Sequence, residues 1–256
     1  LVDIGEHDVT LRADSVTIAS LASDGGTLHA DASIHQYTGH GELDGNVHFE
    51  NWKVGKTETI RERSSVELTG NLTAGDAASE DGFISEGDLN IGAHTLTILD
   101  GDTALFGAHS ETVLTGGALE AVNGIVLEGV QSESTGNLNP LLTANGDTAT
   151  STITGDVKLQ NAVLLATSGN SLEIDGTLSG YGVVIGDISW NALDEERSEF
   201  DSVRLERSVD IEDSTARFLS EGESTVLGAM LSLAGGTIDA ENGLLLGADS
   251  AVSGYG

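Results

Sequence analysis

One stretch decides the fold of this chain: Gly116-Gly117-Ala118-Leu119-Glu120-Ala121-Val122-Asn123-Gly124-Ile125-Val126-Leu127. It returns 119 residues later as Gly235-Gly236-Thr237-Ile238-Asp239-Ala240-Glu241-Asn242-Gly243-Leu244-Leu245-Leu246. A second passage, Leu172-Glu173-Ile174-Asp175-Gly176-Thr177-Leu178-Ser179-Gly180-Tyr181-Gly182, returns 74 residues later as residues 246–256. Imperfect copies of short apolar runs separated by glycine are typical of a solenoid.

Each copy has the same physical layout. A Gly-Gly pair opens the unit at a point where the backbone turns, since glycine adopts positive φ at little cost. A short alternating run follows, then an Asn-Gly turn, then a run of Ile, Val and Leu. Elsewhere the runs between glycines alternate apolar and polar residues with period two, as in Val157-Lys158-Leu159 and Leu172-Glu173-Ile174. This period predicts strands with one buried and one solvated side.

Strands this short, joined by so few residues, suit a sandwich, a barrel or a parallel β-helix. The repeated glycine turns and the small residues favour an all-β, right-handed parallel β-helix (a β-solenoid) with irregular insertions, in which a coil takes roughly 20–25 residues. The 74- and 119-residue spacings then fit three and five coils. Equivalent positions are apolar in both copies, so we expect eight side chains to point inward: Leu119, Ile125, Leu127, Ile174, Leu178, Ile238, Leu244 and Leu246.

The composition limits the partners. The 256 residues include 42 acidic and 10 basic ones, for a net charge of −32, and there is no cysteine. Attraction to nucleic acid or to anionic lipid is therefore excluded. No run of about 18 apolar residues occurs, so we expect no membrane insertion.

We interpret residues 1–256 as a single β-solenoid fragment of a longer repetitive protein, with excursions near 51–63 and 190–217. Eight of the ten basic residues lie in these two passages, which also contain Trp52 and Trp190. Residues 193–205 suit a charged loop on a coil better than a helical turn. Excursions from a repeat are where function tends to reside, although local charge pairing also explains the basic residues.

The acidic turns suggest a metal. Calcium takes hard oxygen ligands, and four aspartates occur in glycine-rich turns or at equivalent repeat positions: Asp102, Asp147, Asp175 and Asp249. No EF-hand loop and no calcium-binding nonapeptide occurs, and turn-forming aspartate is the plainer interpretation. No motif requires a cofactor. Five of the seven histidines lie in the first 48 residues, without the tight spacing of a zinc site.

Catalytic motifs are scarce. Gly39-His40-Gly41 matches one element of polygalacturonase-type glycosidases, but the other elements of that family are absent. Glycoside hydrolysis needs two carboxyl groups across a sugar, and no pair is marked in the sequence. We therefore expect no enzyme activity. The alternative is a carbohydrate-active β-helix: a polysaccharide lyase, a hydrolase or a phage-type spike.

The repeats resemble a known class of proteins. The Gly-Gly-[Thr/Ala]-[Leu/Ile]-x-Ala unit, the Asn-Gly turn and the stretch Gly180-Tyr181-Gly182-Val183-Val184-Ile185-Gly186-Asp187-Ile188 look like bacterial autotransporter passengers and large repetitive surface adhesins. The resemblance covers residues 86–256 well and residues 1–85 poorly. It implies an extracellular or cell-surface location and a structural or adhesive role, and it carries no catalytic residues.

The expected function is that of a non-enzymatic surface protein: a rigid spacer, an adhesin, or a subunit of a self-assembling fibre or layer. Its expected partners are copies of itself, other surface proteins or glycans. Self-association, end to end or side by side, should strengthen with salt, because screening weakens the long-range repulsion between acidic chains.

Overall fold

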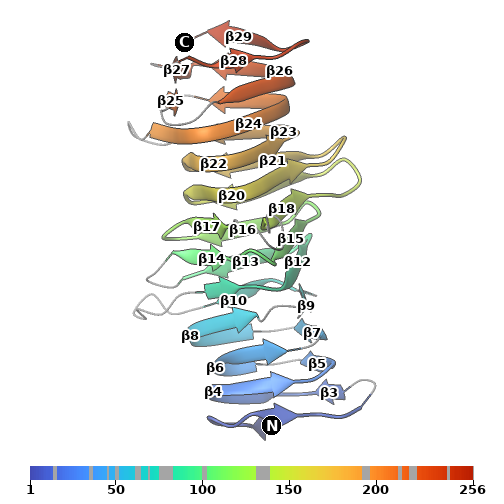
Figure 1. The fold of residues 1–256 in the computed structure, drawn as a ribbon. Coiled ribbons are helices and arrows are strands. Elements are labelled where there is room, and N and C mark those ends of the chain that lie inside the picture. Colours follow the sequence, from blue (N-terminus) through green and yellow to red (C-terminus); the bar gives the residue numbers. More distant parts are fainter. Residues whose placement is uncertain are drawn as a thin grey trace.

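The computed structural model is a stack of parallel strands that runs from the N-terminus at one end to the C-terminus at the other (Figure 1). It describes residues 1–13, 16–34, 37–44, 46–49, 52–60, 65–68, 70–74, 83–99, 103–130, 139–191, 197–212, 215–218, 224–240 and 243–255. These residues form strands and turns, without a helix that would be long and apolar enough to cross a bilayer. The predicted all-β, parallel β-solenoid is confirmed.

Each coil has three sides, which we call faces I, II and III in the order that the chain visits them. Face I contains β1 (Val2–Asp3), β4 (Leu21–His29), β6 (Tyr37–Asp44), β8 (Trp52–Ile60), β10 (Leu72–Ala74), β13 (Thr95–Ile98), β16 (Ala118–Ala121), β19 (Thr150–Thr154), β21 (Ser171–Asp175), β23 (Asp187–Asn191), β24 (Arg197–Glu212), β26 (Thr225–Ala234) and β29 (Ala251–Tyr255). Face II adds β2 (Val9–Thr10), β11 (Phe83–Ser85), β14 (Ala104–Phe106), β17 (Ile125–Glu128), β20 (Val157–Ala166), β22 (Leu178–Ile185), β25 (Thr215–Phe218) and β27 (Thr237–Asp239). Face III adds β3 (Val16–Ile18), β5 (Ala32–Ile34), β7 (Asn46–Phe49), β9 (Ser65–Leu68), β12 (Asp88–Gly92), β15 (Glu111–Leu114), β18 (Leu141–Ala144) and β28 (Leu245–Leu246).

Long strands bend around the corners and contribute to more than one face. The start of β20 pairs with β17 on face II, and its end pairs with β18 on face III. The strand β24 continues through all three faces, since it pairs in turn with β25, β26 and β23. Face III residues in register, such as Leu142, Leu164, Val184 and Leu205, are 20 to 22 positions apart, as predicted for one coil.

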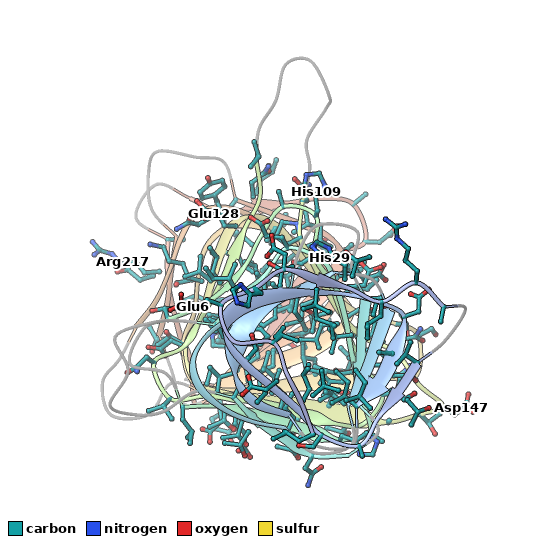
Figure 2. All side chains as sticks on the ribbon, turned by 90° about the horizontal axis from the view of Figure 1, so that it is seen from below. Glu6, His29, His109, Glu128, Asp147 and Arg217 are labelled. Carbon is teal, nitrogen blue, oxygen red and sulfur yellow. The ribbon has the colours of Figure 1, made fainter. Side chains whose placement is uncertain are left out.

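The core is a set of inward ladders, one residue per coil, at the ~4.8 Å spacing of paired strands. Leu142, Leu164, Val184 and Leu205 on face III are fully buried. On face I the side chains of the ladder Leu119–Ile153–Ile174–Trp190 are also buried. On face II the rings of Phe83 and Phe106, from adjacent coils, lie 5.9 Å apart. Figure 2, a view along the rod, shows Asp147 and Arg217 at its rim.

The sequence copies do not occupy equivalent places in the solenoid. Leu119 lies on face I, whereas its copy Ile238 lies on face II. Likewise Leu172 lies on face I and its copy Leu246 on face III. The interpretation of the two spacings as whole numbers of coils is therefore wrong. Because all three faces need the same alternation and the same turns, the repeating unit is one strand with its turn.

The turn geometry is kept even though the face changes. Gly116 and its copy Gly235 have φ of 93° and 95°, and Gly124 and its copy Gly243 have φ of 78° and 94°. These left-handed conformations explain why glycine recurs at both places.

The predicted inward residues divide into two groups. Leu119, Ile125, Leu127, Ile174 and Leu178 are buried, as predicted. The other three belong to the last coil, and for Leu246 the predicted burial is wrong. Leu246 is in register with inward positions of face III but remains 47% exposed, because no described strand stacks above β28. Ile238 and Leu244 are half-buried and pack against the core.

The passages predicted to be excursions are largely built into the ladders. Trp52–Ile60 is β8, which pairs with β6 through an irregular register between Gly39 and Gly41. Arg197–Glu212 is β24, so the prediction of a charged loop over residues 193–205 is wrong for the part from residue 197 on. Trp190 is 1% exposed and belongs to the inward ladder, not to the edge of an excursion. Residues 61–64, 192–196 and 213–214 lie outside the described residues.

Candidate functional site

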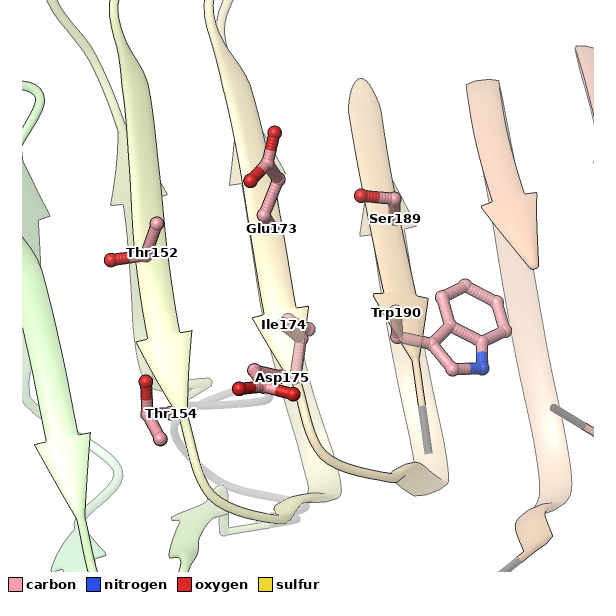
Figure 3. A pocket seen from close by; sticks show the side chains of 7 residues that line it. All are labelled: Thr152, Thr154, Glu173, Ile174, Asp175, Ser189 and Trp190. Atoms are coloured by element: carbon pink, nitrogen blue, oxygen red, sulfur yellow. The ribbon is translucent and has the colours of Figure 1, made fainter. Parts of the chain in front are cut away.

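One hollow lies on the outer side of face I, over β19, β21 and β23 (Figure 3). Its volume is about 430 Å³, and the lining residues are Thr152, Thr154, Glu173, Ile174, Asp175, Ser189 and Trp190. We call it the face I groove. Its polar side chains come from outward positions that alternate with buried ones: Ile153, Ile174 and Trp190 point into the core.

The strand register sets the spacing of these polar groups. Thr152, Glu173 and Ser189 follow one another in one ladder, and Thr154 and Asp175 are neighbours in the next. Groups in one ladder are therefore ~4.8 Å apart along the rod. Glu173 and Asp175, two positions apart in β21, have Cα atoms about 6.6 Å apart. The indole of Trp190 extends away from both carboxyl groups (Figure 3).

The polar side chains that line the groove are carboxylates and hydroxyls. Glu173 and Asp175 are exposed carboxylates, Thr154 is an exposed hydroxyl, and Thr152 and Ser189 are half-buried hydroxyls. No basic side chain is among the lining residues. Such a surface donates and accepts hydrogen bonds to neutral polyhydroxylated molecules and repels anions.

Three of the four predicted calcium ligands belong to the described residues, and these three lie at separate places. Asp175 lies in the face I groove, Asp147 is exposed in the turn after β18, and Asp249 is exposed in the turn before β29 with φ of 62°. Asp102 lies outside the described residues. Across the part of the chain that the structure describes, no group of three or more histidine, aspartate or glutamate side chains is placed to hold a metal ion.

The turn that carries Asp147 is held by the protein itself. Asn170, which is 4% exposed, lies in the turn of the next coil, between β20 and β21. Its Nδ2 donates to the Gly146 carbonyl (3.1 Å) and to Thr167 Oγ1 (2.9 Å), while its Oδ1 accepts from the Ala149 N–H (3.0 Å). Asn170 is thus a corner residue that fixes two adjacent coils. Asn170 was not among the predicted site residues, although its Gly-Asn-Ser context before an alternating run is a turn signal.

A second hollow, of about 470 Å³, lies at the C-terminal end of the stack and is mostly apolar. Its lining residues are Leu233, Gly236, Thr237, Ile238, Leu244, Leu246 and Val252. These are mainly core positions of the last coils, which explains the exposure of Leu246.

Similarity to known proteins does not assign a function to either hollow. Comparison with protein-family models, with curated proteins and with solved structures finds no match for this chain. The fold and the residues themselves carry the functional argument.

Proposed function

We propose that this chain is a non-enzymatic structural or adhesive rod on an extracellular or cell-surface assembly. The observation that supports the proposal best is the continuity of the three parallel ladders from β1 to β29. Each coil contacts its neighbours through both backbone hydrogen bonds and core residues, which gives an elongated body rather than a compact one. Such a body separates what lies at its two ends and presents long, regular flanks.

The charge distribution fits this role. A solenoid has exposed strand surfaces that tend to associate, and a net charge of −32 keeps such surfaces apart in solution. The likeness of the repeats to surface adhesins agrees with an extracellular location, where the absence of cysteine removes any dependence on disulfides.

Surface display tests the proposal. Cells that carry the whole chain on a membrane anchor are compared with cells that carry the anchor alone, for adhesion to immobilised glycans and proteins and for the height of a terminal epitope above the membrane. An adhesive rod increases adhesion, and a spacer raises the epitope by several nanometres. If neither adhesion nor epitope height changes, the proposal is wrong.

The second candidate function is glycan cleavage in the face I groove. The observation in its favour is the pair Glu173 and Asp175, whose ~6.6 Å backbone spacing permits the 6.5–9.5 Å carboxyl separation of inverting glycosidases. Release of reducing ends from a panel of polysaccharides tests it. Activity that is lost in Glu173→Gln and Asp175→Asn but kept in Glu128→Gln, an exposed carboxylate of face II, would establish the enzyme.

Calcium binding is a separate proposal for the acidic turns that include Asp147, Asp175 and Asp249. By linkage, a bound ion raises the melting temperature more than sodium chloride of equal ionic strength does. Identical shifts from the two salts would leave only charge screening.

A further inference from the structure

The outer side of face III contains an aliphatic surface in the middle of the rod. Its members are the outward aliphatic residues of four consecutive strands, β15, β18, β20 and β22, and all six of these aliphatic residues are half-buried. We call them the aliphatic block: Val113, Leu141, Val163, Leu165, Val183 and Ile185.

The block is built from two adjacent ladders. The first is Leu141–Val163–Val183, and it is preceded by Glu111 and followed by Arg204. The second is Val113–Thr143–Leu165–Ile185, and it is followed by Glu206. Thr143, within the block, is only 5% exposed. An uncharged surface about 14 Å long, three ladder steps, therefore lies between charged residues.

The core does not need these side chains. The alternate residues of the same strands, Leu142, Leu164 and Val184, point inward and are fully buried. In the same coils the outward residues of face I are polar, for example Thr152, Glu173 and Ser189. Face II has a narrower aliphatic ladder, Ile84–Leu105–Val126, which is one residue wide and is followed by Lys158. The block on face III is two ladders wide, and it is the broader of these two aliphatic surfaces in a chain with a net charge of −32.

We propose that the aliphatic block is a lateral contact between two copies of this chain, packed with their rods antiparallel. Flat sheets pack face to face about 10 Å apart, so one face III matches another. A two-fold axis along β20 places β20 over its counterpart and β18 over β22 of the second copy. The same operation pairs the register position of Glu111 with that of Arg204, residues of opposite charge, and pairs the position of Val113 with that of Glu206. The first ladder is therefore self-complementary in charge by register.

The charge of the chain favours this contact over others. Two copies repel each other wherever acidic flanks approach, and this repulsion is smaller where two uncharged blocks meet. The block is smaller than the ~800 Å² per partner of a stable interface, so the contact is weak and depends on high local concentration. This proposal goes beyond the rod function, because a spacer or an adhesin does not require lateral pairing.

Sedimentation velocity of the whole chain, over a range of protein and sodium chloride concentrations, tests the contact. We expect association that strengthens with salt and weakens about tenfold or more in Leu165→Lys. The matched control is Val126→Lys, which changes an outward aliphatic residue on face II. Each variant removes one net negative charge, so simple repulsion predicts slightly stronger association for both. If the wild type stays monomeric throughout, or if the two variants associate equally, the proposal is wrong.

A cross-link tests the geometry independently. Because the chain has no cysteine, Val163→Cys introduces one thiol at the centre of the block and Val126→Cys one on the control face. Mild oxidation at high salt should give a disulfide dimer with the first variant several times faster than with the second. Equal rates would overturn the antiparallel arrangement. If Leu165→Lys does not fold, as judged by circular dichroism, Leu165→Thr replaces it, since threonine suits a strand.

Discussion

Gly180→Ala should destabilise the protein more than Gly169→Ala does. Both glycines have positive φ, 95° and 86°, so alanine meets the same backbone penalty at each, roughly 1–2 kcal/mol. They differ in what a Cβ atom would contact. At Gly180 it would overlap the carbonyl oxygen of Leu159 on the preceding coil, whereas at Gly169 its nearest neighbour is the Thr148 Cγ2 at 3.6 Å, an ordinary contact.

The overlap sets the difference between the two variants. Leu159 and Gly180 are paired in the face II ladder, so relief requires that two coils separate locally. Overpacking of this kind costs about 1–3 kcal/mol. We therefore expect a loss of about 2–5 kcal/mol for Gly180→Ala and about 1–2 kcal/mol for Gly169→Ala. At about 2–4 °C per kcal/mol for a chain of this size, the melting temperatures should differ by several degrees.

Urea unfolding followed by circular dichroism measures both variants. Hydrogen exchange of the amides in β20 and β22 shows whether the loss is local, as a stack of coils with nearest-neighbour contacts allows. Equal destabilisation of the two variants would refute the reasoning, because it would mean that close packing between coils at this corner adds nothing to the φ penalty.

Four further predictions concern stability. Thr112→Val should raise the free energy of unfolding by about 1–2 kcal/mol, because the buried Thr112 Oγ1 has no hydrogen-bond partner. A lower melting temperature for this variant would contradict the prediction. Leu164→Ala should lower the free energy of unfolding by about 2–5 kcal/mol, whereas Leu246→Ala should lower it by less than about 1 kcal/mol, since Leu246 is already half exposed to solvent. Similar urea midpoints for the two variants would contradict this prediction. Asn170→Ala should lower the free energy of unfolding by about 2–4 kcal/mol through three lost hydrogen bonds, two of which join two coils. Calorimetry against Asn145→Ala, an exposed position that accepts one hydrogen bond from Thr167, provides the comparison. Raising sodium chloride from about 10 mM to about 1 M, which shortens the Debye length from ~30 Å to ~3 Å, should raise the melting temperature; a fall would show that attractive charge pairs outweigh the repulsion.

The alternation in the sequence predicted short strands, and the repeated glycine turns with the small residues favoured a solenoid over a sandwich or a barrel. These patterns were not enough to place the copies. A strand such as residues 237–239 meets the same demands on any face, so similarity to residues 118–121 identifies the type of unit and not its side. The placement depends on the number of residues in every intervening turn, and those lengths vary.

The candidate sites were harder to predict for a related reason. Ala162-Val163-Leu164-Leu165-Ala166 is apolar throughout, so its sequence does not tell which residues face outward. Only the register reveals that Val163 and Leu165 lie on the outer side. Similarly, Glu173 and Asp175 became neighbours of Thr152 and Thr154 through pairing between coils, which no local motif records.

The displacement of the copies between faces has a consequence for how such a chain changes over time. Because one strand with its turn is the unit, gain or loss of a single unit shifts everything downstream by one side of the coil, while the interior stays apolar. The strands downstream of the change then occupy another face of the coil, and their outward residues point in a different direction about the rod axis. A flank such as the aliphatic block can thereby come to face a new direction without a single substitution in the core.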